Sequence, residues 1–185
     1  MRVCEVMTED VACCSPRDSL ERAAQIMWER DCGCVPVIDG FRRPVGMITD
    51  RDACMSAYLR GRRLAEVGLD EVMSREVHAC QPEDELAVAH DLMREHRVRR
   101  LPVVDEDGLL VGLVSLNDII RHTAKPTSSA KSRPTAKDLV ATLSNVSQPR
   151  WTLESKVVKP SPPARRPAAR SAKSAAKRST KRKQS

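Results

Sequence analysis

Two segments of the chain repeat one pattern of glycine, hydroxyl and carboxylate residues. One runs from Gly46 to Asp52 and the other from Gly112 to Asp118, and in each a hydroxyl residue precedes the aspartate by three positions. If a strand here leads into a helix, the hydroxyl lies beside the free N–H groups of the first helical turn, which favour an anion such as phosphate. The aspartate could accept two hydrogen bonds from a ribose cis-diol, and the glycine allows close backbone approach.

The same pattern has a purely structural interpretation. A Ser or Thr followed three residues later by an acid is also a capping box, which stabilises a helix by about 1 kcal/mol without any ligand. The two interpretations are compatible, because Thr49 or Ser115 can cap its helix while the site is empty. The residue types alone leave both open.

Both segments belong to a longer internal repeat. Residues 5–52 align with residues 71–118 at a spacing of 66 residues without a gap, and 17 of the 48 aligned pairs are identical. A duplicated supersecondary unit of this kind is expected to pack its two copies on each other about a pseudo-twofold axis.

Each copy contains the elements that would position its motif. In the first copy, a short extended run at 11–13 precedes a helix that begins near Leu20. Two short strands follow at 34–38 and 45–48, and then a helix from 49 that ends at Gly61. The second copy repeats this order. We therefore predict an α+β fold of two β-α-β-β-α repeats, divided into domains at 1–61 and 62–122.

This order of elements, with its Met7-Thr8 and Met73-Ser74 openings, closely resembles the cystathionine-β-synthase (CBS) domain. A tandem pair of such domains is called a Bateman module, and the resemblance covers roughly residues 1–120. It implies a homodimer and an adenosine ligand such as AMP, ADP, ATP or S-adenosylmethionine. In that family the hydroxyl and aspartate residues contact ribose and phosphate. The implied ligand-binding residues are Thr49, Asp52, Ser115 and Asp118.

The resemblance also implies how the base would be held. The family buries adenine between its first strand and the strand that contains the Val/Leu-Pro pair. The implied walls are Val11 with Val35 and Val37, and Val77 with Leu101 and Val103. Because the chain has only two Trp, one Tyr and one Phe, apolar walls and main-chain hydrogen bonds would have to hold the base instead of ring stacking.

Arginines near the motifs could supply positive charge for a phosphate. Arg51 lies inside the first motif, and its alternative role is that of a charge on a solvated helix face. Arg99 and Arg100 lie where the strand expected at 100–104 begins. They could bind a polyphosphate or pair with nearby carboxylates.

The remaining reactive residue types form no recognisable catalytic or metal-binding pattern. The seven cysteines are an odd set with irregular spacing, which favours reduced thiols in a cytoplasmic protein. Cys13, Cys14, Cys32 and Cys34 lack the usual C-x₂-C zinc spacing. We predict no catalytic residue, no metal and no required cofactor. No apolar run reaches 18 residues and no signal peptide is evident, so we expect no membrane contact.

Charge divides the chain into two unlike parts. Residues 1–120 hold 15 arginines, no lysine and 23 acidic residues, a net charge of −8; residues 121–185 hold 17 basic and 2 acidic residues, a net charge of +15. The basic, Pro-, Ser- and Ala-rich composition predicts a disordered tail over 123–185. Within it, Leu139, Val140 and Leu143 have helical spacing, so 135–143 could dock on a partner or form only a transient turn.

Two functions from different classes fit these observations. The first is a stand-alone, non-enzymatic regulatory module that binds an adenosine ligand and signals to an unknown partner protein. The alternative is a nucleic-acid-associated protein, held non-specifically on DNA or RNA by residues 123–185, with the repeat pair as a dimerisation scaffold. A tail that only solubilises the protein or folds back on the acidic part is also open.

Overall fold

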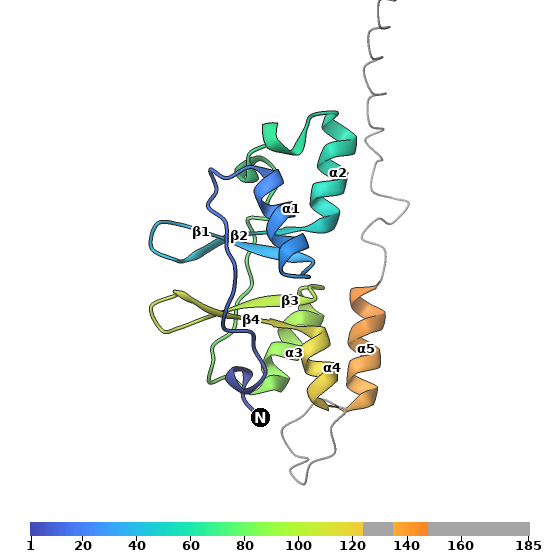
Figure 1. The fold of residues 1–185 in the computed structure, drawn as a ribbon. Helices are drawn as coiled ribbons and strands as arrows, with labels where there is room; N and C mark the ends of the chain where they lie inside the picture. The colour runs from blue at the N-terminus through green and yellow to red at the C-terminus, as the bar shows by residue number, and fades with distance from the viewer. Residues whose placement is uncertain (124–134, 148–185) are drawn as a thin grey trace, which may run out of the picture.

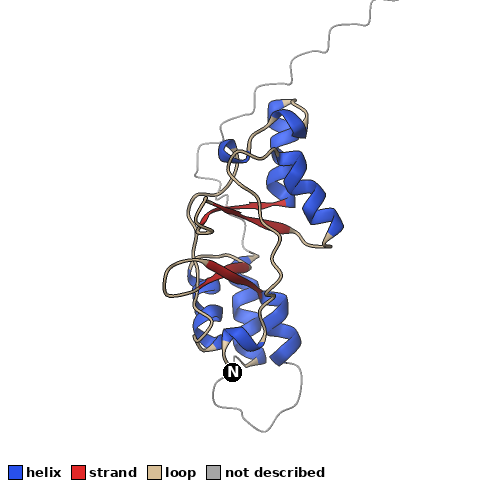
Figure 2. Ribbon diagram, turned by 60° about the vertical axis from the view of Figure 1, so that its left-hand side comes forward, coloured by secondary structure: helices blue, strands red, loops and turns tan. Residues whose placement is uncertain are grey.

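The computed structural model describes residues 1–123 and 135–147. Its two copies stack so that their two-stranded sheets lie near the centre and their helices lie toward opposite ends (Figures 1 and 2). The first copy contains α1 (Leu20–Glu29), β1 (Cys34–Ile38), β2 (Pro44–Thr49) and α2 (Asp50–Arg60). The second contains α3 (Leu86–Glu95), β3 (Arg100–Val104), β4 (Leu110–Ser115) and α4 (Leu116–Thr123). Short 3₁₀ helices lie at Val3–Glu5, Leu64–Glu66 and Leu69–Glu71.

The two copies have equivalent strand pairing. In the first, β1 and β2 are antiparallel with Val35 opposite Ile48; in the second, β3 and β4 pair with Leu101 opposite Val114. Both pairings shift register at the same point, after Val37 and after Val103. The α+β fold and the 66-residue repeat expected from the sequence are confirmed.

The first strand expected in each copy is shorter than predicted. Only Cys14 joins the first sheet, as a parallel bridge: its N–H donates to the Pro36 carbonyl at 3.0 Å and its carbonyl accepts from the Ile38 N–H at 2.8 Å. The next step of a parallel ladder would need an N–H from Pro36, which proline lacks. Cys80 and Pro102 repeat the arrangement in the second copy. Residues 11–13 therefore run as irregular chain.

The segment before each copy packs on the other copy. The Val3 N–H donates to the Asp84 carbonyl at 2.9 Å, and Val3 is fully buried in the core of the second copy. In return, Val67 and Leu69 belong to the core of the first copy. The sequence division at 61 and 62 thus differs from the packing, because each core includes residues that precede the other copy in the chain.

A further helix, α5 (Ala136–Val146), lies in the segment that composition predicted to be disordered. It packs against α3. Leu139 is buried in the second core, and the Thr142 hydroxyl lies 2.6 Å from Nε2 of the buried His90. The prediction of disorder is wrong for residues 135–147, and the alternative that 135–143 docks is confirmed, with α3 of the same chain as its partner. The rest of the predicted tail lies outside the described residues.

No helix in the described residues is both long enough and apolar enough to cross a membrane.

Candidate functional site

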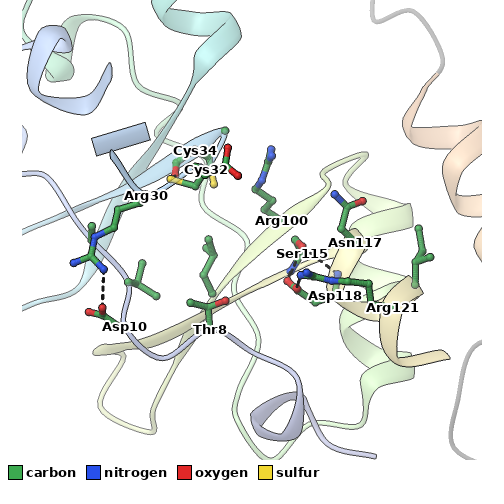
Figure 3. A pocket seen from close by; sticks show the side chains of 16 residues that line it. Thr8, Asp10, Arg30, Cys32, Cys34, Arg100, Ser115, Asn117, Asp118 and Arg121 are labelled. Carbon is green, nitrogen blue, oxygen red and sulfur yellow. Dashed lines mark hydrogen bonds and ion pairs between the residues drawn. The ribbon is translucent and has the colours of Figure 1, made fainter. Parts of the chain in front are cut away.

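A cavity of about 720 Å³ lies between the two copies, and we call it the Ser115 cleft. The first copy and the N-terminal segment contribute residues 8, 10–12 and 30–34, and the second copy contributes Arg100 and the β4–α4 junction (Figure 3). Its volume is within the roughly 300–1,000 Å³ typical of small-molecule sites. Of the predicted residues, the cleft brings together Val11, Arg100, Ser115 and Asp118.

Ser115 and Asp118 form a reciprocal set of hydrogen bonds at the start of α4. The Ser115 hydroxyl and backbone N–H both donate to Asp118 Oδ2, at 2.6 Å and 2.9 Å, and the Asp118 N–H donates to Ser115 Oγ at 3.2 Å. Thr49 and Asp52 make the same bonds at the start of α2. The capping interpretation of both motifs is therefore confirmed, and in each only Oδ1 of the aspartate remains outside the box.

Asp118 Oδ1 contacts a cation that the sequence analysis did not select. Arg121, one helical turn further along α4, donates to this oxygen. The Asp118 side chain is 12% exposed and the Arg121 side chain 71% exposed, so the pair joins a buried carboxylate to a solvated guanidinium. The i, i+3 spacing could have identified this pair from the sequence, because such residues share a helix face.

Arg100 reaches across the cleft from the second copy toward the first. A Cβ built on Gly33 would lie 2.9 Å from a terminal nitrogen of Arg100 and 3.2 Å from Asp50 Oδ2, so the absence of a side chain at Gly33 makes room for this guanidinium. Figure 3 shows Arg100 between the Cys32–Cys34 wall and the Ser115–Asp118 side. The other two predicted arginines, Arg51 and Arg99, are exposed and do not line the Ser115 cleft.

The predicted apolar walls differ from the observed ones. The side chains of Val35, Val37, Leu101 and Val103 are fully buried in the two cores and do not line the Ser115 cleft. The reason is that these small sheets bury their strands against the helices, so alternate residues of the Val-Pro-Val strands point inward. Val77 is half-buried and equivalent to Val11 in the repeat, but it does not line this cleft either.

Several lining residues were missed by the sequence analysis. The largest group, residues 30–33, comes from the loop between α1 and β1, opposite the motif of the other copy, and this pairing across copies could not be read from a single repeat. One example is Arg30, the C-cap of α1, whose Nη1 lies 2.8 Å from Asp10 Oδ2 and so ties the end of this helix to the N-terminal segment. The missed residues are Thr8, Arg30, Asp31, Cys32, Gly33, Cys34, Leu113, Asn117, Ile120 and Arg121, whereas Asp10 and Ala12 belong to the segment 10–13 that the resemblance implied for the base.

The glycines of the motifs allow each sheet to pack closely against the segment that precedes the other copy. A Cβ on Gly112 would lie 2.6 Å from Met7 Sδ, and a Cβ on Gly46 would lie 2.5 Å from Met73 Sδ. The close approach expected at these glycines therefore exists, but its partner is a methionine of the segment that packs against the sheet.

The three buried cysteines, Cys14, Cys34 and Cys80, have thiols with a raised pKa. Burial raises the pKa of the Cys34 thiol to about 11, although the Arg100 guanidinium acts in the opposite direction. Burial also raises the pKa of Cys14 to about 11 and that of Cys80 to about 12. Among the described residues, no group of three or more His, Cys, Asp or Glu side chains is arranged to hold a metal ion.

The region equivalent to this wall in the second copy has different chemistry. His78 takes the place of Ala12 and His96 the place of Arg30. The two imidazole rings stack with centroids 3.6 Å apart and an angle of 10° between their planes. The duplication has therefore preserved the capping boxes while the walls have diverged.

Two interlocked copies of one α+β unit with a cleft between them define a tandem-repeat module. The chain belongs to the CBS domain family, whose model matches residues 3–56 and 69–125. It is 38% identical to the CBS domain-containing protein YhcV of Bacillus subtilis over 116 residues, which are 62% of this chain and 80% of that protein. Other, longer relatives match this chain over only 23% of their own length.

Solved structures of related proteins have the same fold. A structure of Hypoxic Response Protein I with two coordinated zinc ions is 31% identical, with a TM-score of 0.60, and the match covers 66% of this chain and 98% of that one. A structure of CBSX2 in complex with AMP is 26% identical, with a TM-score of 0.57, and the match covers 65% of this chain and 94% of that one.

Proposed function

We propose that the Ser115 cleft binds an adenosine-containing ligand, and that the chain is a non-enzymatic regulatory module. The observation that carries this proposal is the position of Asp118, whose carboxylate is fixed by Ser115 at the edge of a cavity of about 720 Å³. A relative in the same family, CBSX2, has been solved in complex with AMP, which supports the choice of ligand class.

Each part of such a ligand has a suitable counterpart in the cleft. Asp118 Oδ1 is the acceptor for ribose hydroxyls, because Oδ2 is already used by the capping box. Arg100 and the first turn of α4 provide positive charge for phosphate. The base would lie against Val11, Ala12 and Cys32, with main-chain groups of these irregular segments as its hydrogen-bonding partners.

The same geometry suggests how binding would be transmitted. The cleft walls come from both copies, so a ligand would contact both and favour one relative arrangement over another. A regulated partner protein, or the second subunit of a homodimer, would then recognise the favoured arrangement. AMP, ADP, ATP and S-adenosylmethionine are the ligands to compare.

Isothermal titration calorimetry on the full chain tests this proposal. We expect saturable binding of at least one of the four ligands, and a loss of about tenfold or more in Asp118→Asn, which keeps a capping oxygen but removes the charge. Asp52→Asn is the matched control, because it makes the same change in the equivalent capping box outside this cleft. Absence of heat from a folded wild-type sample, or equal affinity in Asp118→Asn, would contradict the proposal.

A further inference from the structure

The two copies contact each other in the same way on both sides of the module. On one side Thr8 pairs with Leu113 of β4 through two hydrogen bonds of 2.9 Å, and the chain that follows Thr8 lines the Ser115 cleft. On the other side Ser74 pairs with Met47 of β2 through hydrogen bonds of 2.9 and 3.0 Å. The chain that follows Ser74 therefore runs past the equivalent position beside the capping box of the first copy, which we call the Thr49 side.

The wall of the Ser115 cleft is open at two positions. Ala12 contributes only a methyl group to it. Arg30, the C-cap of α1, is paired with Asp10 at 2.8 Å. Figure 3 shows this pair on the far side of the cleft from Ser115. Neither side chain therefore fills the space in front of the capping box.

On the Thr49 side, histidines occupy both of these positions. The rings of His78 and His96 stack with centroids 3.6 Å apart and an angle of 10° between their planes. Nε2 of His78 lies 3.4 Å from Oε1 of Glu76, the residue equivalent to Asp10. Because the His78 side chain is only 21% exposed, the stacked pair is packed within the wall and does not project into solvent.

We propose that the stacked His78–His96 pair closes the Thr49 side, so that the chain binds one adenosine ligand, in the Ser115 cleft only. This inference rests on the proposed function. The two rings are in van der Waals contact, so no other group fits between them. A ligand can occupy this space only by separating the rings, and it then loses the free energy of their stacking.

Closure is consistent with what remains of the motif on this side. Thr49 and Asp52 keep the hydrogen bonds of the capping box, but a capped helix needs no ligand. The residue equivalent to Arg100 is Cys34, whose short and buried side chain cannot reach across as the Arg100 guanidinium does. The Thr49 side therefore keeps the feature that stabilises the fold and lacks the open wall.

The stoichiometry of binding to the full-length protein, measured by calorimetry, tests this inference. AMP and S-adenosylmethionine are the two probes. For the wild type we expect about one ligand per chain for the probe that binds, and about two per chain in His78→Ala, which copies the residue of the first repeat. Circular dichroism checks that each variant is folded. Every variant has the same basic C-terminal segment, so non-specific attraction of AMP is common to all of them.

Two further variants separate closure by a ring from other effects of the substitution. His78→Phe is the matched control, because it keeps a flat ring that can stack on His96, and it should still bind one ligand per chain. Asp52→Asn added to His78→Ala should return the stoichiometry to one, because it removes the carboxylate of the opened site. In the wild-type background, Asp52→Asn should change neither affinity nor stoichiometry.

The outcomes separate this inference from the proposed function. Two ligands per wild-type chain, or one per chain in both the wild type and His78→Ala, would overturn the inference and leave the adenosine site in the Ser115 cleft standing. Binding by His78→Ala alone would support closure of the Thr49 side and contradict the proposed site. Absence of binding of both probes to folded wild type and folded His78→Ala would overturn both.

Discussion

Gly46 and Gly112 occupy equivalent places in β2 and β4. Each is in close contact with a methionine of the segment that precedes the other copy in the chain. Their conservation between the two copies was visible in the sequence, but the sequence could not identify the neighbour that requires a glycine. The neighbour becomes evident only once Met7 is known to lie on the second copy and Met73 on the first.

Replacing these glycines by alanine should destabilise the fold. In Gly112→Ala the new methyl group would lie 2.6 Å from Met7 Sδ and 3.2 Å from the Thr8 carbonyl, so both the side chain and the crossing backbone must shift. We expect a loss of about 1–3 kcal/mol in the free energy of unfolding, measured by urea denaturation. Gly40→Ala is the control, because nothing lies within 4 Å of its Cβ position. Equal stability of the two variants would show that Met7 does not constrain Gly112.

For the candidate site too, the sequence predicted the local motif but not the neighbours that the other copy supplies. Thr49, Asp52, Ser115 and Asp118 could be placed from the sequence, because a local spacing of three residues determines the capping box. The cleft walls could not, because they depend on which copy faces the motif. The predicted Val35 and Leu101 walls are core positions for a separate reason, because each small sheet buries these strand residues against its helices.

At the scale of elements, α5 shows how local pattern and composition can disagree. The spacing of Leu139, Val140 and Leu143 indicated a helix, whereas the basic and polar surroundings indicated disorder. In the structure Leu139 is buried but Val140 and Leu143 are largely exposed, and the second buried contact is the polar Thr142. Its partner, His90, lies 52 residues earlier in the chain, so no local pattern could have revealed the docking site.

The Thr142–His90 contact should contribute measurably to the docking of α5. Thr142→Val keeps the shape of the side chain but leaves a nitrogen of the buried His90 ring without its partner at 2.6 Å. We expect a destabilisation of about 1–3 kcal/mol, measured by thermal or denaturant unfolding. Ser144→Ala, which removes an exposed hydroxyl from the same helix, should have little effect. If the two variants lose the same stability, the hydrogen bond is not what holds α5 on α3.

At the scale of the whole molecule, the chain combines an acidic, interlocked pair of repeats with a strongly basic C-terminal third. Residues 1–120 have a net charge of −8 and residues 121–185 one of +15. Because the segment before each copy packs on the other copy, the two repeats cannot separate without breaking both cores. A truncation at His122 would also remove α5, so it is a poor way to isolate the basic segment.

The nucleic-acid alternative therefore needs a full-length test. In one variant, the nine Lys and Arg residues between 165 and 183 are replaced by Gln; in a second, the sequence of residues 160–185 is scrambled at constant composition. If the segment binds phosphate backbones by counter-ion release, the wild type and the scrambled variant should bind duplex DNA with equal affinity, and log K should fall linearly with log salt concentration. The neutralised variant should lose this binding while keeping the affinity of the Ser115 cleft for its nucleotide, because the described cleft residues all precede residue 122.

DNA binding that persists in the neutralised variant would place the contact on the repeats. No binding by the wild type even at low salt would instead favour a basic segment that is held by the acidic repeats or only solubilises the protein.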